Sequence, residues 1–423
     1  MRIVVLGGGV IGVTAAYMLA ERGDDVVLIE RRDALAQETS DVNAGLIAPG
    51  HAFTWASPAA PKTLVRSLLG QDTSMRMHWK PDLALYRWGM RFLSNCTTPR
   101  SQLNTVRRLK LSQHSREVLD RVVADNGLEF HQNKAGALFL HRTQEALERG
   151  IARLSILKEF GEPQEYLDAD QCAKLEPSLG PVRDKIAGAI YSASAMSGDS
   201  SMFANALAAK AKDLGVEFEL GTTVTGFEVE RGTVRGVRTN KGVFRGDAYL
   251  LCLGVHSRAV GRTLGLSLPI YPVKGYTLNA PVRTQGLAPR ISGIDEGRLV
   301  AWSRFGDSIR MTGTADFTGY DLSISSKSSR SIFQSGGELF PESFDWEAAE
   351  MKIGLRPVTS NELPLIGHAR KHPNVILNTG HGNLGWTMAA GSADIVADLL
   401  HGSRPKLDPR TFGIDESVLA RAR

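Results

Sequence analysis

Three glycines near the N-terminus stand at the spacing that binds the phosphates of a dinucleotide. Gly7, Gly9 and Gly12 form the pattern G-x-G-x-x-G. The first glycine allows a tight turn, the second admits a pyrophosphate close to the backbone, and the third lets a helix pack closely on a strand. Glu30 follows 18 residues after Gly12, where a carboxylate accepts hydrogen bonds from an adenosine ribose and repels a 2′-phosphate. The pattern predicts a dinucleotide-binding site.

A second glycine-rich segment, Thr379–Thr387, lies far along the chain, between an expected strand and an expected long helix. Backbone N–H groups and the positive end of a helix stabilise an anion or an electron-rich ring edge at such a loop. The N1–C2=O edge of a reduced flavin carries negative charge, so the loop fits a flavin. A plain strand-to-helix turn is the alternative, but it requires one glycine, whereas Gly380, Gly382 and Gly385 are three within six residues.

The residues around these loops predict the elements that must hold them. Ile3–Leu6 is a short apolar run typical of a buried parallel strand, residues 10–22 form a helical pattern that ends at Gly23, and Val26–Ile29 repeats the strand pattern. Together they make a βαβ unit and predict an α/β fold. Further helices are expected near residues 81–92, 100–126, 144–160, 201–214 and 386–400, and strands near 137–141, 217–220, 224–230, 234–239, 249–252, 271–278, 299–304, 309–313 and 375–377.

Length and composition exclude several classes of protein. The 423 residues suggest two or three domains, and 42% apolar with 22% charged residues argues against a disordered, fibrous or polytopic membrane protein. The segment Ile3–Ala20 is uncharged, yet its four glycines would cripple a membrane helix or a signal peptide, so no transmembrane span is expected. Three cysteines without a C-x-x-C pair predict neither a disulfide framework nor a thiolate metal site, and a reducing, cytoplasmic compartment fits best.

The net charge of +5 arises from 50 basic and 45 acidic residues, which we expect to be interspersed along the chain. A solvated surface explains this balance, and a loose attraction to an anionic membrane is compatible with it. A nucleic-acid site needs a clustered basic face, so no nucleic-acid partner is expected. Nothing in the sequence resembles a metal-ligand set, a Ser-His-Asp triad or a Walker loop.

Five motifs in order make the chain resemble the FAD-dependent D-amino-acid oxidase/glycine oxidase superfamily, and most closely its bacterial D-amino-acid dehydrogenases of the small-subunit type. They are the N-terminal unit with Glu30, Glu38-Thr39-Ser40 with Asn43-Ala44-Gly45, Pro272-Val273-Lys274-Gly275-Tyr276, Gly354-Leu355-Arg356-Pro357, and Gly380-His381-Gly382 through Gly385-Trp386-Thr387. One turn departs from the family. A Pro-Asp-Gly-type turn is common between Arg356 and Gly367, whereas this chain has Ser360-Asn361-Glu362 there, which leaves the turn near the flavin and the choice of substrate open.

The resemblance implies a Rossmann-type, glutathione-reductase-like FAD-binding domain of the D-amino-acid-oxidase type, joined to a second α+β substrate domain. We expect the FAD-binding domain to comprise residues 1–50, 195–268 and 350–423, and the substrate-binding cap to comprise 51–194 and 269–349. The expected FAD contacts are Gly7, Gly9, Val10, Ile11, Gly12, Glu30, Arg31, Ser40, Asn43, Ala44, Gly45, Leu46, Val224, Gly254, Gly380, His381, Gly382, Asn383, Leu384, Gly385, Trp386 and Thr387.

Arg356 is the first candidate for contact with the substrate. A planar guanidinium can hold a carboxylate by two hydrogen bonds, and the position of Arg356 before Pro357 matches the carboxylate-binding arginine of the family's glycine oxidases. A structural pairing with a local acid such as Glu362 is the alternative.

Lys274 and Tyr276 are the other candidate catalytic residues. They alternate with Tyr271 and Gly275 in an expected strand, so one face could aim a hydroxyl or an ammonium at the substrate or the flavin. Sheet packing and a solvated lysine are the alternatives. Three further side chains are expected in supporting roles: His381 lining the pocket or orienting the flavin, His51 in a turn, and Trp386 packing at a helix start. Approach of His51 to the pocket is the alternative for that residue.

The resemblance also implies a reaction: oxidation of D-amino acids to 2-oxo acids and ammonium, with electrons passed to a quinone or another respiratory acceptor. The enzyme would work in the cytoplasm, with weak peripheral contact to the inner face of the membrane. An oxygen-using amine oxidase acting on glycine, sarcosine or D-proline or hydroxyproline stays open, because oxygen reactivity depends on small changes around the flavin. A tRNA-modifying flavoprotein and a nicotinamide-only dehydrogenase are disfavoured alternatives. The preferred amino acid and the oligomeric state stay open.

Overall fold

The N-terminal apolar run forms a central strand of a six-stranded sheet. The computed structural model describes residues 1–68, 75–77 and 81–412. In spatial order the strands are β19 (Leu365–Ala369), β20 (His372–Thr379), β13 (Ala248–Leu251), β1 (Arg2–Leu6), β2 (Asp25–Ile29) and β9 (Glu217–Glu219). All neighbours are parallel except β19, which pairs antiparallel with β20. The inner strands are buried on both faces, as their continuous apolar sequences require.

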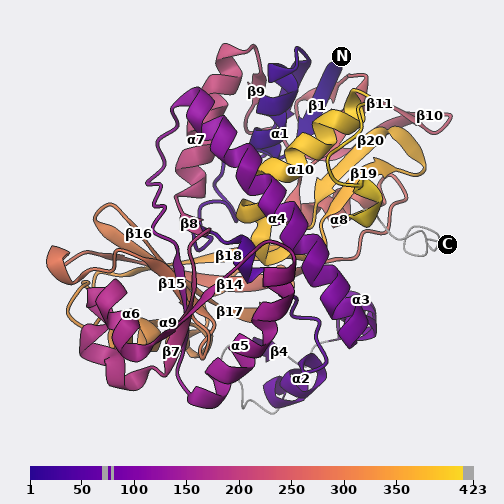
Figure 1. Ribbon diagram of the computed structural model, residues 1–423. Helices are drawn as coiled ribbons and strands as arrows, with labels where there is room; N and C mark the ends of the chain where they lie inside the picture. Colours follow the sequence, from indigo (N-terminus) through magenta and orange to yellow (C-terminus); the bar gives the residue numbers. More distant parts are fainter. Residues whose placement is uncertain (69–74, 78–80, 413–423) are drawn as a thin grey trace.

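Helices cover one face of this sheet (Figure 1). Helix α1 (Val10–Glu21) follows β1 directly, and α10 (Gly385–Leu400) follows β20 through its glycine-rich loop. The two helices pack against each other, α7 (Ser200–Asp213) packs on α1, and α4 (Thr98–Asn126) packs on α10. The opposite face is covered by a small antiparallel sheet of β10 (Val224–Glu230), β11 (Thr233–Thr239) and β12 (Gly242–Phe244).

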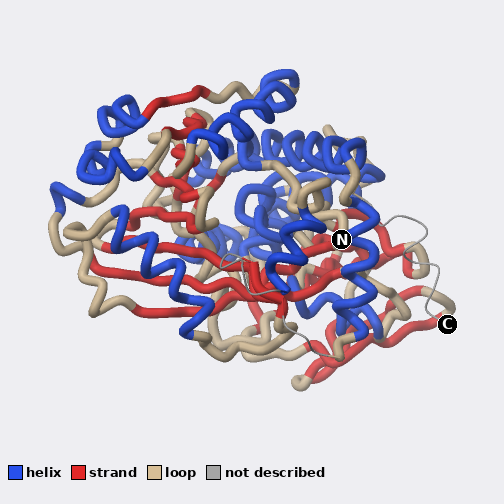
Figure 2. Tube along the Cα trace, turned by 90° about the horizontal axis from the view of Figure 1, so that it is seen from below, coloured by secondary structure: helices blue, strands red, loops and turns tan. Residues whose placement is uncertain are grey.

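A second, nine-stranded sheet makes the other half of the molecule (Figure 2). Its strands run in the order β18 (Glu350–Thr359), β14 (Ile270–Pro281), β17 (Ser308–Phe317), β16 (Val300–Phe305), β15 (Ser292–Asp295), β5 (Ala137–His141), β7 (Gly188–Ser192) and β6 (Glu165–Asp168), and β4 (Met75–Met77) pairs with β17. The long antiparallel pair of β14 and β18 places Val273 opposite Arg356 and Gly275 opposite Gly354.

The remaining elements pack around the second sheet or join the two halves. They are α6 (Ala169–Leu175) and α9 (Ser326–Leu339) against its core, α5 (Gln144–Glu159) beside β5 and β7, α3 (Leu83–Asn95) against β14, α2 (Ala60–Leu68) beside β4, the short pair β3 (Leu46–Ile47) with β8 (Met196–Ser197), and α8 (Ser257–Arg262) near β10.

The predicted architecture, a Rossmann-type domain with a second α+β domain, is confirmed, but two elements lie on the other side of the predicted division. Strand β18 was expected in the FAD-binding segment 350–423, yet it forms its ladder with β14 in the second sheet. Helix α4 was expected in the cap, yet its buried Leu111, Leu119 and Val122 belong to the core beneath the first sheet. A ten-residue ladder and an apolar helix face decide their places more strongly than chain order does.

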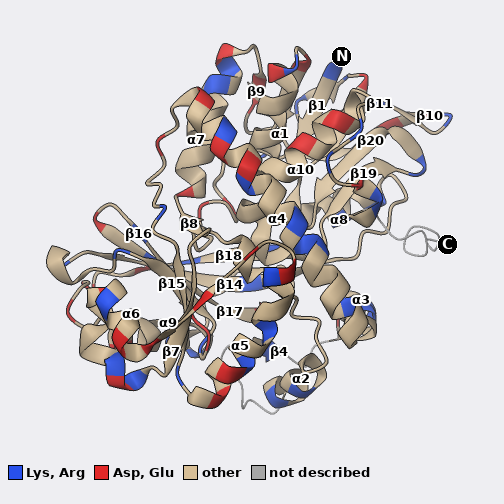
Figure 3. Ribbon diagram, viewed as in Figure 1, with Lys and Arg blue, Asp and Glu red and all other residues tan. Residues whose placement is uncertain are grey.

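Basic residues gather in one part of the chain, which corrects the expectation that the charges are interspersed. Residues 55–116 contain eleven Lys or Arg and two Asp or Glu, a net charge of +9, whereas the whole chain carries +5. Figure 3 shows Lys and Arg without acidic residues along α2 and α3. Among the described residues, no helix is long and apolar enough to cross a membrane.

Candidate functional site

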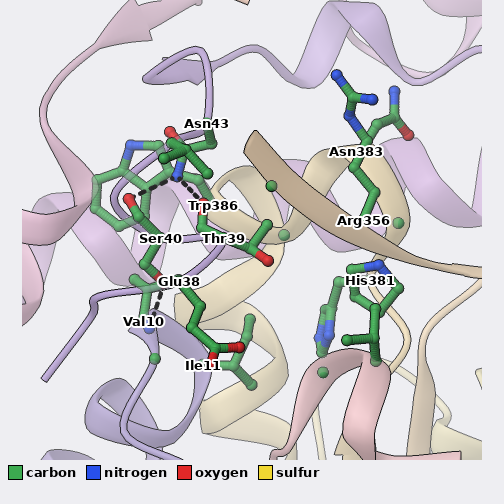
Figure 4. A pocket seen from close by; sticks show the side chains of 18 of the residues that line it. Val10, Ile11, Glu38, Thr39, Ser40, Asn43, Arg356, His381, Asn383 and Trp386 are labelled. Carbon is green, nitrogen blue, oxygen red and sulfur yellow. Dashed lines mark hydrogen bonds between the residues drawn. The ribbon is translucent and has the colours of Figure 1, made fainter. Parts of the chain in front are cut away.

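A cavity of about 470 Å³ lies at the carboxyl ends of β1, β13 and β20 and extends beneath β14 and β18. Open α/β sheets bind their ligands at this edge. All but one of the predicted cofactor residues line the cavity, and the labelled ones surround it in Figure 4. The lining residues among them are Gly7, Gly9, Val10, Ile11, Glu30, Arg31, Ser40, Asn43, Ala44, Gly45, Leu46, Val224, Gly254, Gly380, His381, Gly382, Asn383, Leu384, Gly385, Trp386 and Thr387.

Gly12 is the exception, because it faces the strand instead of the cavity. A Cβ on Gly12 would lie 1.9 Å from the carbonyl oxygen of Gly7. Gly12 therefore allows α1 to pack closely on the turn after β1, which is the role predicted for the third glycine, and it makes no direct contribution to the cavity wall.

The end of the cavity at the N-terminus of α1 offers groups that can bind a phosphate and a ribose. Helix α1 starts at Gly9 without a side-chain cap, and Ser40 Oγ accepts a hydrogen bond from Val10 N at 3.0 Å. The remaining N–H groups and the helix dipole favour an anion here. Glu30 is fixed by accepting hydrogen bonds from Gly8 N (2.7 Å) and Arg32 N (2.8 Å), so its carboxylate is held at the cavity wall.

Arg31 lies at the same end but is already paired. Its guanidinium donates to Glu38, which also contacts His256 at 3.6 Å. Burial alone would raise the pKa of Glu38, but hydrogen bonds from His256 and Arg31 lower this pKa to about 2. The pair therefore places a compensated, not a free, positive charge at this wall.

The N-terminus of a second uncapped helix, α10, lies at the other end of the cavity. Helix α10 begins after Leu384, which offers no side-chain cap. Asn378, fully buried at the end of β20, has no partner for either carboxamide atom among the described residues, and neither has Trp386 Nε1. Buried polar atoms normally find partners. Two open helix N-termini and these polar atoms on one cavity fit an elongated, polar cofactor such as FAD.

His381 lines the cavity as a neutral side chain. Its Nε2 lies 3.1 Å from Ser392 Oγ on α10, and only 3% of the residue is exposed. Burial lowers the pKa of His381 to about 3, so the imidazole is uncharged at neutral pH. This geometry supports the predicted lining and orienting role and does not supply a proton acceptor with a pKa near neutrality.

Arg356 brings a positive charge to the cavity. Its Nη1 donates to the carbonyl oxygen of Thr314 at 2.8 Å, and no carboxylate in the described part of the chain forms an ion pair with it. Burial lowers the pKa of Arg356 to about 10, which leaves the guanidinium charged at neutral pH. Glu362, its predicted alternative partner, pairs with Arg108 instead at 3.0 Å. A cation placed this way can bind the carboxylate of a ligand.

Lys274 and Tyr276 lie on the wrong face of β14 to reach the cavity. Lys274 Nζ is 3.2 Å from Asp321 Oδ2, and Tyr276 OH donates to Asp316 Oδ2 at 3.1 Å inside the core of the second sheet. Neither residue lines the cavity, whereas Gly275 between them does. The predicted alternation of faces is right, but the two candidate catalytic side chains point away from the site, and the geometry does not support their catalytic roles.

Several other residues line the cavity although no motif in the sequence indicates them. Trp55, Thr312, Thr314 and Asn378 line it. His51, for which approach to the pocket is the less favoured expectation, lines it too, and its Nε2 lies 3.0 Å from Glu296 Oε1. The alternation of Thr312 and Thr314 in an apolar strand was an available signal. The position of Trp55 depends on a long-range hydrogen bond from its backbone N–H to Glu362, which spacing along the chain does not reveal.

Comparison with known proteins gives consistent matches over the whole chain. The family model described as FAD dependent oxidoreductase (DAO) matches residues 2–399. "D-amino acid dehydrogenase 2" of Mesorhizobium japonicum is 42% identical, over 97% of this chain and 99% of the relative. "D-amino acid dehydrogenase" of Phenylobacterium zucineum is 41% identical, over 99% and 98%.

Solved structures share the fold. Glycine oxidase from Geobacillus kaustophilus superposes with a TM-score of 0.75 at 21% identity, covering 98% of this chain and 99% of that one. L-proline dehydrogenase from P. horikoshii superposes with a TM-score of 0.74 at 19% identity, covering 98% and 96%. At these identities the likeness concerns the arrangement of the two domains.

Proposed function

The chain belongs to the FAD-dependent oxidoreductase family, and we propose that it uses FAD to oxidise D-amino acids to 2-oxo acids and ammonium. The observation that carries this proposal is Arg356, a buried cation at the wall of the cofactor cavity without a carboxylate partner among the described residues. The choice of D-amino acids rests on relatives about 40% identical along nearly their full length that carry the name D-amino acid dehydrogenase.

FAD, when bound, would supply the acceptor for the two electrons that leave the Cα–H bond of the amino acid. The chain must then hold the substrate, and Arg356 does so through the carboxylate. The open N-terminus of α10 at the cavity wall would stabilise negative charge on a reduced flavin held there. Because His381 is neutral and bonded to Ser392, it keeps the loop in place and takes no proton.

The balance of the reaction requires water after the oxidation. The amino acid loses two electrons and two protons and becomes an imino acid, and water then replaces the imino group to give a 2-oxo acid and ammonium. The amine must be uncharged when it is oxidised, since its lone pair forms the new C=N bond. The side chains of the site therefore need to orient the substrate more than to deprotonate it.

Anaerobic bleaching of the flavin tests the proposal directly. The purified, FAD-loaded protein is mixed with D-amino acids, their L-enantiomers, glycine and sarcosine, and the flavin absorbance is followed. We expect D-enantiomers to bleach the flavin and L-enantiomers to leave it oxidised. Bleaching by L-forms alone would overturn the assignment of D-amino acids, and a colourless protein that cannot be loaded with FAD would overturn the cofactor.

For the electron acceptor we propose a quinone or another respiratory carrier. The runner-up is an oxidase that passes electrons to oxygen and acts on glycine, sarcosine or D-proline. Turnover in air separates the two: a quinone or dye should be reduced with little hydrogen peroxide formed. A stoichiometric yield of peroxide would identify the oxidase instead.

We further propose that the protein works in the cytoplasm and adheres weakly to the inner face of the membrane. The support is the exposed surface of α2 and α3, two helices that pack on the same apolar cluster and that carry exposed apolar and basic side chains. Leu83 is 72% exposed and Met90 65%, and Lys62, Arg66 and Arg87 on the same two helices are exposed as well. Apolar side chains flanked by Lys and Arg are typical of contact with anionic lipid.

A further inference from the structure

A buried arginine on α4 connects two walls of the cavity that are far apart in the sequence. Only 1% of Arg108 is exposed. Its Nη1 donates to Glu362 Oε1 at 3.0 Å, and its Nη2 donates to Asn383 Oδ1 at 2.8 Å. Glu362 belongs to the turn after β18, and Asn383 belongs to the glycine-rich loop before α10. One guanidinium therefore fixes the turn and the loop relative to each other.

Glu362 holds a third part of the wall through its carboxylate. Oε1 accepts a hydrogen bond from Trp55 N at 3.0 Å and Oε2 accepts one from Ala56 N at 2.7 Å. Glu362 has φ 60°, in the left-handed region that glycine adopts readily and that residues with a side chain rarely adopt. Such a conformation persists where the surroundings fix it, and here the fixing contacts are Arg108 and the backbone at Trp55. The turn that departs from the family's pattern thus carries a buried, fully engaged carboxylate.

The hydrogen bond from Arg108 determines which atoms of Asn383 face the cavity. A guanidinium has donors only, so Asn383 must turn its amide oxygen toward Arg108. Nδ2 is left over, and it has no hydrogen-bond partner within the described residues. Asn383 and Arg356 both line the cavity, and Figure 4 shows the amide and the guanidinium at the same end of it. An amide donor and a cation there make a two-point site for a planar anion.

We propose that Asn383 Nδ2 donates a second hydrogen bond to the substrate carboxylate that Arg356 binds, and that Arg108 and Glu362 are positioning residues that orient this amide. The inference rests on the proposed function, because it adds a contact to the amino-acid substrate. Two donors on one carboxylate fix its plane as well as its position. The Cα–H bond of the substrate is thereby aligned for oxidation.

Variants of Asn383 test the contact itself. The FAD-loaded enzyme is assayed with the D-amino acid that bleaches it fastest, and propanoate, a carboxylate without an amine, is titrated by the change in flavin absorbance. For Asn383→Leu we expect KM and the propanoate Kd each to rise about tenfold to a hundredfold, as for loss of one hydrogen bond to a charged group. We expect kcat to fall as well, because the Cα–H bond of the substrate is then less well aligned. Asn383→Asp should weaken propanoate binding further, since it replaces the donor by a like charge.

The positioning role is tested with Glu362→Gln and a matched control. Glu176 is 1% exposed, against 3% for Glu362, and it accepts hydrogen bonds from three backbone groups, Arg290 N and Ile291 N at 2.7 Å and Ser178 N at 3.1 Å, but it does not line the cavity. Glu362→Gln should raise the propanoate Kd, whereas Glu176→Gln should lower stability without changing this Kd. In Asn383→Leu, the added Glu362→Gln should have little further effect on Kd, because both changes remove one interaction.

Folding of the variants does not limit the test. If Glu362→Gln leaves Arg108 as an unpaired buried charge and fails to fold, Arg108→Met with Glu362→Met removes both charges and avoids that penalty. The double variant should show the same rise in the propanoate Kd.

An unchanged KM and propanoate Kd in Asn383→Leu would overturn the inference. A changed spectrum of the ligand-free flavin with unchanged propanoate binding would also overturn it, because the amide would then face the cofactor. Failure of the proposed function looks different: no D-amino acid would bleach the flavin, while propanoate binding would still respond to Asn383.

Discussion

The guanidinium of Arg356 lies directly over Gly275. A Cβ built on Gly275 would lie 2.5 Å from both Nη atoms, closer than a real side chain allows. The two residues sit on neighbouring strands, since β14 and β18 pair with Val273 opposite Arg356. The place of the cation at the cavity wall therefore depends on the absence of a side chain at residue 275.

Replacing Gly275 by Ala should displace Arg356 without unfolding the protein. The atoms in the way are the far end of a flexible side chain, so the guanidinium can swing aside. We expect KM for the amino acid to rise about tenfold or more, because a shifted cation no longer meets the carboxylate, with FAD content unchanged. Steady-state kinetics and the ratio of flavin to protein absorbance measure both quantities.

Gly337→Ala on α9 is the matched control for this change. A Cβ there meets no atom within 4 Å, and alanine is favoured over glycine inside a helix by about 1 kcal/mol. The control should raise stability slightly and leave KM as it is. An unchanged KM in Gly275→Ala as well would show that the position of Arg356 over Gly275 is irrelevant to binding.

Arg356→Ala should remove both the charge and the bidentate contact to the carboxylate. Truncating one partner of a buried charge-assisted pair costs roughly 2–4 kcal/mol, so kcat/KM should fall about 10²–10³-fold. Arg356→Lys keeps the charge but not the planar guanidinium, so its kcat/KM should lie between those of the parent and Arg356→Ala. Kinetics of the three proteins at equal FAD loading measure the effect.

The cofactor should remain bound in these variants, because the predicted contacts to its phosphates and ribose lie at the other end of the cavity, around Gly9 and Glu30. Near-native kcat/KM in Arg356→Ala would remove Arg356 from the substrate site. A colourless Arg356→Ala protein would assign the residue to the cofactor or to the fold instead.

Local patterns predict the candidate cofactor residues, and the structure brings all of them except Gly12 to the wall of one cavity. The strand–turn–helix sequence around Gly7 and Gly9, and the loop from Gly380 to Gly385, carry their information within a few residues. Most of the expected anion-binding donors there are backbone N–H groups, and the turn itself determines where they point. The same holds for Arg356, whose strand position beside Pro357 brings it to the cavity.

Side chains held by long-range contacts could not be placed from the sequence. The alternation of β14 fixes that Lys274 and Tyr276 share a face, but it does not tell which face meets the cavity. Arg108 stands in a basic run that is typical of a solvated surface, yet it is buried because Glu362, 254 residues away, neutralises it. Buried ion pairs of this kind depend on topology alone.

The neutral state of His381 predicts a pH dependence of stability. Its pKa is about 3 in the folded protein and near 6.5 when unfolded. The unfolded state therefore binds more protons between these values, and stability falls as the pH drops below about 6.5, by up to ~1.4 kcal/mol per pH unit. In urea titrations, the loss of unfolding free energy from pH 7 to pH 5 should be about 2 kcal/mol smaller in His381→Gln than in the parent.

Gln at residue 381 can still hydrogen-bond Ser392, so the comparison concerns the proton more than the packing. Other groups titrate alike in both proteins and cancel in the difference. Equal losses between pH 7 and pH 5 in the two proteins would mean that His381 is protonated in the folded state, and its exclusion as a base would then be withdrawn.

Binding to anionic vesicles tests the proposed membrane contact of α2 and α3. The protein is sedimented with vesicles of phosphatidylglycerol or of phosphatidylcholine at low and at high salt. We expect binding to the anionic vesicles only, with release at high salt, because screening weakens attraction between exposed charges. Lys62→Glu with Arg87→Glu should weaken binding at least about tenfold, since each basic side chain near the surface contributes about 1 kcal/mol.

Lys210→Glu with Lys212→Glu is the matched control, because these exposed lysines stand on α7 at the opposite end of the molecule from α2 and α3 (Figure 1). The control changes the net charge by the same amount, so a loss of binding in both double variants would mean that overall charge, and not one face, governs adhesion.

The contribution of the exposed apolar side chains can be measured separately. Leu83→Ser with Met90→Ser removes two of these side chains without changing any charge, and it should weaken the binding that persists at intermediate salt. All three variants should keep full activity with a soluble dye, since none of the substituted residues lines the cavity. A parent protein that stays in the supernatant with anionic vesicles at low salt would refute the membrane contact.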